Sequence, residues 1–457
     1  MKIKVWLSII LCVSMLAGCS FPVDKFLGDS RENSGDSLGL TPDFSYTYEE
    51  QTPNILVNQI GYRPKDDKVA ILQGSDLNSR FYVCNANTDK IVFSGSLKEA
   101  GVTPYGEKEG NQEGEALYLA DFSRLAGTGK YYLYHENLGY SDTFTIEDGV
   151  YDSLENYLLG QLEKENRNTS ALCYQLAGML FSLELYTEQI KDGEKLQQIL
   201  RDKIELLRKA QDEETGSVYE VIPDEVTPQK PSGGEISLAA TAEYAGVMAM
   251  YSCYLQYFDQ TEAGQYQEAA EKAFFSISGS LDNVSFDAGY FAVTQLYKRT
   301  FRSSYSQAIG QYLSLKEEQT SYTEYNFTPF GDYGYLSAGD GINLEWSRQL
   351  MNTVMKQAES ISLASVRNHY YVSEEREFYD VKGMLQDMTI MALVNYVITN
   401  HEYSTLQKNY LDYFLGRNPD ARCLVESFGT RNMPEGAEEM IDETYAALLY
   451  LLLQSTK

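Results

Sequence analysis

The hydrophobic pattern of this chain changes once, near Gly149, from short β-type runs to long helical ones. Before that point, β-branched and aromatic residues come in short runs that polar or Gly-containing turns separate. After it, apolar residues recur at three- and four-residue spacing, which is the period of a helix. A single switch of this kind predicts a multidomain protein with a β-sandwich first and an all-α domain second.

Seven short runs predict the strands of the first domain. Seven strands in a module of about 95 residues are typical of an immunoglobulin-like β-sandwich. The module contains no Cys…Trp…Cys signature, so an antibody-type domain is not indicated. The predicted strands are residues 55–57, 69–72, 81–84, 91–93, 116–119, 131–135 and 142–146.

Ten periodic segments predict the helices of the second domain. Little strand signal remains there, and an all-α toroid or an array of helical hairpins is the natural architecture. We find no fixed-period repeat, which disfavours a solenoid of identical units. The predicted helices are residues 151–163, 171–186, 195–210, 238–257, 266–277, 288–299, 344–358, 384–400, 404–415 and 438–453.

The N-terminus reads as an export signal. Two lysines precede an apolar run over residues 5–16, which is too short to span a bilayer as a mature helix. The run ends in residues 16–19 (LAGC), which look like a bacterial lipobox whose Cys19 accepts a lipid. The alternative is an ordinary secretory signal in which Cys19 is incidental. We expect a lipoprotein signal peptide over 1–19, a flexible linker over 20–52 and an extracytoplasmic, membrane-anchored protein.

Charge and composition limit the classes of molecule that this chain is expected to bind. Lys plus Arg number 37 and Asp plus Glu number 66, so the formal charge is 37 − 66 = −29. Such a chain repels phosphate backbones and anionic lipid faces, so no nucleic-acid partner is expected. An uncharged polysaccharide meets no such penalty. Tyr is common at 37 residues against 2 Trp, and we expect most of these rings to pack inside the two domains.

The cysteines predict neither a metal site nor a cofactor. Of the six, Cys12 and Cys19 lie in the signal region, and the other four are isolated from one another. No CxxC spacing suggests zinc, and buried free thiols are the simplest expectation.

Two ends of the sandwich module carry a specific resemblance. Residues 55–64 (ILVNQIGYRP) look like the opening strand of the immunoglobulin-like module that precedes many family 9 cellulase domains. Residues 129–133 (GKYYL) and 141–146 (SDTFTI) resemble the end of the same module. Gly61 permits a turn, and Pro64 ends the strand pairing.

Three helical segments resemble the catalytic domain of glycoside hydrolase family 9. They are residues 206–219 (LLRKAQ…GSVY), 238–249 (LAATAEYAGVMA) and 411–429 (LDYFLGRNP…FG). The last is the most specific of the three. The resemblance runs from about residue 54 to the C-terminus, so we place the sandwich at 53–147 and the helical domain at 148–457. It implies an (α/α)6 barrel with a cleft at one end.

The resemblance also implies a chemistry. Family 9 enzymes are inverting glucanases, which need one carboxylic acid and one carboxylate on opposite faces of the sugar. Counted back from the last helix, Glu439 occupies the place of the family's general acid. A shifted register would favour Glu438 or Glu443 instead. The alternative interpretation is an acidic first turn of a helix, which the helix macrodipole favours.

The base has no counterpart at the expected place. The family carries its Asp pair before the helix that begins here near Ala171, but residues 166–174 read NRNTSALCY. The base is therefore unknown. Asp332, in the segment GDYG (331–334), is a secondary candidate, although we expect that segment to lie in a loop after a helix. Asp340 is a similar case.

The export signal predicts a cell-surface lipoprotein, and the resemblance to family 9 implies a cellulase-type hydrolase that acts on O-glycosyl bonds in β-1,4-glucan or a related polysaccharide. A second hypothesis is a catalytically inactive glycan-binding or scaffolding surface protein. A third is a structural partner of other surface proteins through the β-sandwich.

Overall fold

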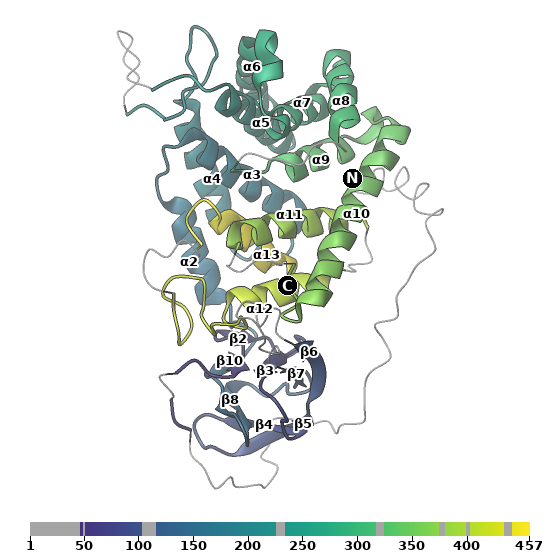
Figure 1. Cartoon of the computed structure of the whole chain (residues 1–457). Coiled ribbons are helices and arrows are strands. Elements are labelled where there is room, and N and C mark those ends of the chain that lie inside the picture. The colour runs from purple at the N-terminus through teal and green to yellow at the C-terminus, as the bar shows by residue number, and fades with distance from the viewer. Residues whose placement is uncertain are drawn as a thin grey trace. The chain divides into compact units, whose positions relative to one another are not determined.

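The computed structural model describes residues 46–48, 51–102, 116–224, 234–316, 324–373, 380–398, 403–433 and 441–457. These residues form two compact units. One unit holds the helices of residues 162–357. The other combines the β-strands and the helix that follows them with the helices of residues 358–457. Figure 1 labels the elements.

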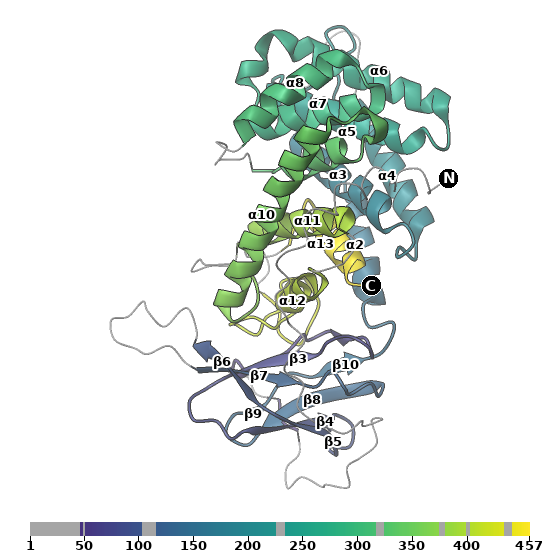
Figure 2. The same ribbon diagram turned by 90° about the vertical axis from the view of Figure 1, so that its right-hand side faces the viewer.

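The strands form a two-layered β-sandwich (Figure 2). A four-stranded sheet has the order β1-β3-β7-β6. A second sheet has the order β2-β10-β8-β4-β5, with β9 paired to β8. The strands are β1 Ile55–Leu56, β2 Gly61–Tyr62, β3 Val69–Gln73, β4 Arg80–Asn85, β5 Ile91–Ser96, β6 Lys98–Val102, β7 Ala116–Asp121, β8 Gly129–His135, β9 Gly139–Tyr140 and β10 Phe144–Ile146.

Alternation along the strands builds the core between the two sheets. In β4, Phe81 and Val83 point into this core while Tyr82 between them is only half-buried. Strand β8 places Tyr131 and Leu133 in the same core. Burying each large apolar side chain contributes about 1.5–3 kcal/mol, so the two inner faces hold the sheets together.

Twelve α-helices occur in the described part of the chain. Helices α3, α5, α11 and α13 are apolar nearly all round, which is typical of helices buried on every side. Helices α4 and α10 are amphipathic. The helices are α2 Asp152–Glu163, α3 Thr169–Tyr186, α4 Gly193–Arg208, α5 Leu238–Leu255, α6 Gln260–Ile277, α7 Phe286–Thr300, α8 Ser303–Leu315, α9 Thr328–Leu336, α10 Leu344–Asn368, α11 Val381–Val397, α12 Ser404–Phe414 and α13 Ala446–Ser455.

In the unit of residues 162–357, buried helices alternate with outer ones along the chain. Helix α5 packs against α3, α6 and α7, and α7 packs in turn against α8 and α9. Polar caps fix where the buried helices begin. Ser237 accepts a hydrogen bond from the backbone of Ala240 at the start of α5, and Asp259 caps α6 in the same way. None of the helices described has both the length and the hydropathy of a bilayer-spanning segment.

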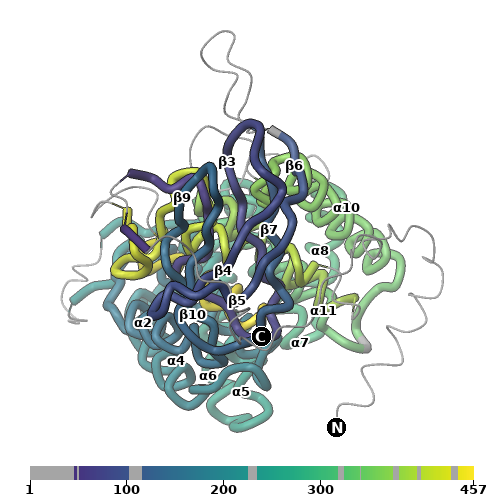
Figure 3. The backbone as a smooth tube through the Cα atoms, turned by 90° about the horizontal axis from the view of Figure 1, so that it is seen from below, coloured from purple at the N-terminus to yellow at the C-terminus, as the bar shows by residue number. Residues whose placement is uncertain are grey.

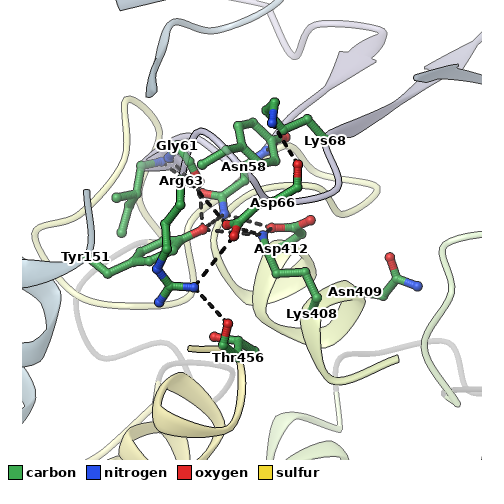
Figure 4. A network of polar contacts seen from close by, with 12 residues as sticks. Asn58, Gly61, Arg63, Asp66, Lys68, Tyr151, Lys408, Asn409, Asp412 and Thr456 are labelled. Carbon is green, nitrogen blue, oxygen red and sulfur yellow. Dashed lines mark hydrogen bonds and ion pairs between the residues drawn. The ribbon is translucent and has the colours of Figure 1, made fainter. Parts of the chain in front are cut away.

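In the other unit, a buried polar network joins the sandwich to α12 (Figure 4). Asp412 of α12 is buried and accepts a hydrogen bond from Asn58 of the β1–β2 loop at 2.8 Å. The same carboxylate pairs with Lys408 and lies 3.6 Å from the guanidinium of Arg417. Arg417 extends the network to the sandwich, because its guanidinium donates a hydrogen bond to the carbonyl of Val69 in β3 at 3.2 Å.

Gln59, next to Asn58, holds the loop that follows α12. Its side-chain oxygen accepts hydrogen bonds from the backbone N–H groups of Thr430 and Arg431, at 2.8 and 2.9 Å, and its amide donates to the carbonyl of Ala421. Gly416 makes this approach possible. Its φ is +119°, and a Cβ atom there would lie 2.7 Å from the Gln59 side chain.

The structure confirms the seven predicted strands and the ten predicted helices, most of them to within a few residues. Helix α10 ends ten residues later than predicted, α6 begins six residues earlier, and the start of the last helix also differs. That helix was predicted from residue 438, whereas α13 begins at Ala446 and residues 434–440 lie outside the described part. The sequence missed the two-residue strands β2 and β9, strand β6, and helices α8 and α9. The expectation of a loop at 331–334 was wrong, since this segment lies inside α9. The four described cysteines are free and buried, as predicted.

We predict that Asp412→Asn lowers the free energy of unfolding by about 3–5 kcal/mol, because the neutral amide leaves Lys408 and Arg417 buried without their shared counter-charge. Chemical denaturation of the purified protein measures this. The matched control is Asp67→Asn, an exposed residue whose change should stay within about 0.5 kcal/mol. Equal stability of the two variants would contradict the structural role of the network.

Candidate active site

The segment where the resemblance places the base begins α3 and is occupied by capping interactions. The side chain of Asn168 accepts a hydrogen bond from the backbone N–H of Ala171 at 2.9 Å. The Thr169 hydroxyl donates to the carbonyl of Tyr219 at 2.7 Å. These side chains satisfy the free backbone groups at the helix start and bind the neighbouring turn. They are neutral, so they cannot take a proton from water at neutral pH.

Asp332 is buried inside α9 and forms an ion pair. Both of its carboxylate oxygens accept hydrogen bonds from the ammonium of Lys316, at 2.7 and 2.9 Å. The hydroxyl of Tyr290 donates to the same carboxylate at 2.9 Å. A water molecule would have to displace these donors before Asp332 could act on it. The contacts favour a structural role, in which the carboxylate neutralises a buried lysine.

The proposed acid lies outside the described residues. Glu438 and Glu439 fall in the segment 434–440, and the side chain of Asp340, in the short 3-10 turn Gly339–Gly341, is likewise not described. Glu443 is described and is half-buried in the turn before α13. Asp442 in that turn accepts hydrogen bonds from the backbone N–H groups of Thr444 and Tyr445, at 2.9 and 3.0 Å.

Helix α5 carries a buried acid that sequence reasoning missed. Glu243 is 2% exposed, and burial raises the pKa of its carboxyl to about 7. A hydrogen bond with Ser170 of α3 opposes this shift, and the nearby charge of Asp287, in the first turn of α7, adds to it. The Oε2 atom of Glu243 has no hydrogen-bond partner among the residues that the structure describes. A buried orphan oxygen of this kind is costly unless it is protonated or meets a donor.

Asp287 links this acid to the start of the next buried helix. It is 1% exposed, and its Oδ2 accepts a long hydrogen bond, 3.5 Å, from the backbone N–H of Phe327 just before α9. Ser170, Glu243, Asp287 and Phe327 therefore bring together the N-terminal parts of α3, α5, α7 and α9.

A second acid with a shifted pKa lies in the unit that contains the sandwich. Burial raises the pKa of Asp387, in α11, to about 6, against the effect of a hydrogen bond from Ser373, while the charge of Asp380 adds to the rise. The hydroxyl of Tyr410 accepts a hydrogen bond from the Ser373 backbone at 2.7 Å and fixes that residue.

Carboxyl groups that titrate near neutrality can both give and take a proton under physiological conditions. This is the property that general acid–base catalysis needs, and strongly shifted groups cluster at functional sites. Glu243 and Asp387 each have it within their own unit. Within the described ranges, no group of three or more His, Cys, Asp or Glu side chains is arranged to hold a metal ion.

The sequence did contain a signal for Glu243. The residue lies in the segment 238–249, where it is the one charged side chain on a helix that is apolar all round. Glu is almost never fully buried unless it has a partner, so an acid at such a position indicates a special environment. Asp387 gave a weaker signal, because it is half-buried and α11 also carries Lys382.

Comparison with known families gives two matches along the chain. Residues 50–139 match the model of the cellulase N-terminal ig-like domain. Residues 166–437 match the model of glycosyl hydrolase family 9. Among curated proteins, none matches the chain by sequence.

Solved structures show the same fold. A metagenome-derived family 9 endoglucanase superposes with a TM-score of 0.74 at 17% identity, covering 88% of this chain and 99% of that one. A family 9 glycoside hydrolase of Bacteroides ovatus gives 0.69 at 17%, with 88% and 98% covered. A single mutant of a thermostable endoglucanase from Alicyclobacillus acidocaldarius gives 0.70 at 15%, with 88% and 99% covered. The predicted fold, an immunoglobulin-like β-sandwich followed by an (α/α)6 barrel, is confirmed.

We predict that Glu243 makes the protein less stable as pH rises from about 5 to about 8. The pKa of this carboxyl is near 7 in the folded chain and near 4.5 when unfolded, so the folded state holds the extra proton in between. The stability that this proton provides is present at low pH and is lost as pH passes 7, a change of about 3 kcal/mol.

Unfolding of the wild type and of Glu243→Gln at pH 5 and pH 8 measures this effect. The variant should lose much less stability between the two values than the wild type does. Glu262→Gln, in the first turn of α6, serves as the control and should follow the wild type. An unchanged pH dependence in Glu243→Gln would show that another group is responsible.

Proposed function

Since the chain belongs to glycosyl hydrolase family 9, we propose that it hydrolyses O-glycosyl bonds in β-1,4-glucan or a related neutral polysaccharide at the surface of a bacterial cell. The observation that carries this proposal is the family match over residues 166–437. The endoglucanase activity named for two of the structural neighbours is in keeping with it. The formal charge of −29 also favours an uncharged substrate.

The proposed mechanism is hydrolysis with inversion. One carboxylic acid protonates the leaving oxygen, while a carboxylate roughly 6.5–9.5 Å away activates a water molecule on the opposite face of the sugar. We assign the acid to Glu439, because counting residues back along the sequence from the last helix reaches the family's acid at this position. The water then attacks the anomeric carbon as the leaving-group oxygen receives its proton, and the base takes one proton from the water.

The base is the open position, and besides Asp332 we consider two acids with raised pKa values, each described within its own unit. Glu243 and Asp387 have carboxyl pKa values of about 7 and about 6. Either group is partly ionised at neutral pH and can accept a proton. Asp332 remains the less suitable choice, because Lys316 and Tyr290 already occupy its oxygens.

A second candidate function is glycan binding without cleavage. It is favoured by the neutral capping side chains at residues 166–174, where family 9 enzymes carry their Asp pair. A barrel without a positioned base would keep its affinity for the chain of sugars but lose most of its rate, because general-base assistance is worth about 10²–10⁴-fold.

We predict that the protein releases reducing sugar from soluble β-1,4-glucan, with the product first appearing as the α-anomer. Glu439→Gln should lower the rate by about 10²–10⁴-fold, because the amide cannot donate the required proton. Proton NMR of early products and a reducing-sugar assay measure the two effects. Glu438→Gln and Glu443→Gln are the matched controls and should keep most activity.

The same assay locates the base and separates the two candidate functions. Glu243→Gln, Asp387→Asn and Asp332→Asn are compared, each with its unfolding curve, so that loss of fold is not mistaken for loss of chemistry. Turnover that survives Glu439→Gln contradicts the acid assignment. Affinity for glucan without turnover in the wild type would favour the binding protein.

We further propose that Cys19 carries a lipid that anchors the protein to the cell membrane. In a bacterial host, Cys19→Ser should shift the protein from the detergent phase to the aqueous phase of a Triton X-114 extract and abolish labelling with a radioactive fatty acid. The matched control is Cys12→Ser, which removes a thiol from the same signal region and should leave both results unchanged. Labelling that survives Cys19→Ser would contradict the lipoprotein proposal.

A further inference from the structure

The outer face of the six-stranded sheet carries aromatic rings where a sandwich normally exposes polar side chains to water. In antiparallel sandwiches one face of each sheet is buried and the other is solvated, which gives a polar outer face. Here the strand positions opposite to the core are rich in tyrosine. These tyrosines pack around buried Cys84 and Ile91, and we call them the tyrosine face: Tyr46, Tyr82, Tyr132, Tyr134 and Tyr140.

Strand register arranges three of these rings in a row. Tyr82 of β4 is the direct cross-strand partner of Tyr134 of β8, and Tyr134 is the partner of Tyr140 of β9. The ring centroids lie 6.5 Å apart in the first pair and 5.4 Å apart in the second. All three side chains are half-buried, so part of each remains in contact with solvent. The pairing of the strands therefore fixes the positions of these three residues relative to one another.

Two further rings fix the row from one end. Tyr132 is buried beside it, and its hydroxyl donates to the carboxylate of Asp89 at 3.0 Å. Tyr46, from the segment before the sandwich, lies with its ring centroid 4.8 Å from that of Tyr132 and 5.7 Å from that of Tyr140. The rings of Tyr82 and Tyr134 form the other end of the row.

The strand positions around the row carry no negative charge, although the Asp89 carboxylate lies at one end of the row, where it binds Tyr132. The strand positions that share its face with the tyrosines carry Arg80 and Lys130, together with Ser94, Ser96 and Thr145, which lie opposite Tyr82, Arg80 and Lys130 in the register. None of the strand residues on this face is Asp or Glu, in strands that are all described, although the whole chain carries 66 acidic residues. Figures 1 and 2 show β4 and β5 on the side of the sandwich away from α12, and Figure 3 views the sandwich from that side.

We propose that the tyrosine face is a second binding site for a neutral polysaccharide chain, separate from the residues proposed for hydrolysis. The faces of a pyranose ring are covered with C–H groups, which pack against an aromatic ring, while its equatorial hydroxyls hydrogen-bond to hydroxyl side chains at the rim. The spacing of the three rings is comparable to the advance per sugar in an extended β-linked chain. Only the class of ligand, a glucan, rests on the proposed function.

The site would hold an insoluble or long polymer near the cell while another part of the chain acts on it. Weak stacking at several rings adds up along one polymer, so a row of rings binds a long chain better than a short one. This accounts for the rings crossing three strands in a line. A face made for another protein would instead be expected to form a closed patch with a polar rim.

Native affinity electrophoresis tests the proposal on the full mature chain carrying Glu439→Gln, which prevents hydrolysis during the run. In gels that contain hydroxyethylcellulose, the protein should be retarded relative to gels without polymer. Adding Tyr82→Ala and Tyr134→Ala should weaken the apparent affinity about tenfold or more. Tyr118→Ala, on β7 of the opposite sheet, is the matched control and should leave the retardation unchanged.

Two further variants keep the outcome interpretable if the alanine variants unfold. Tyr82→Phe and Tyr134→Phe keep the rings and should keep most of the retardation. The proposal is overturned if the parent chain migrates equally in both gels, or if the folded double alanine variant is retarded as strongly as the parent. If the wild type hydrolyses glucan but is not retarded in the polymer gel, only the second binding site is refuted. If it is retarded through the tyrosine face but hydrolyses nothing, only the proposed activity is refuted.

Discussion

The buried carboxylate of Asp412 is the constraint on which the unit containing the sandwich depends. It lies on α12, far along the chain from the β1–β2 loop that it binds, and it pairs with Lys408, Asn58 and Arg417 at once. Ionised groups removed from water are stable only when each has its partner, so the network forms completely or costs several kcal/mol. The neighbouring residue Gln59 holds the loop after α12 in place through three further hydrogen bonds. The sandwich therefore supports the loop that follows α12.

The sequence predicted those elements whose residues show a clear hydrophobic period, and it missed elements that are too short or too rich in Pro and Gly to show one. The core strands have alternating apolar residues, so β4 and β8 were found, whereas β2 and β9 have two residues each and give no alternation to detect. Helix α9 contains Pro329 and two glycines, which read as loop residues. Pro at its first turn is instead favourable, and Gly331 packs against Tyr290, where a Cβ atom would come within 2.7 Å.

The contacts of the candidate site residues could not be predicted from the sequence. The resemblance to family 9 implies two opposed carboxyls, and the count back from the last helix proposes Glu439, which lies outside the described residues, as one of them. The sequence could not show that Asp332 neutralises Lys316, because that lysine comes from a segment without a motif. Nor could it show that Glu243 is buried with one oxygen lacking a partner, since burial depends on how α3, α5 and α7 pack. The shift of a pKa is a tertiary property, and a single sequence carries only the composition around it.

Tyrosine links the two halves of the functional hypothesis. In the helical unit, tyrosines such as Tyr174 and Tyr290 are buried, and their rings stack on other aromatic rings of the core. On the outer sheet face they stand in register and are only half-buried. Packing against buried Cys84, Ile91 and Tyr132 accounts for the buried part of these rings but not for the part that stays in contact with solvent. A surface that keeps aromatic rings against water, on a chain of strongly negative charge, is best explained by an uncharged ligand with apolar faces.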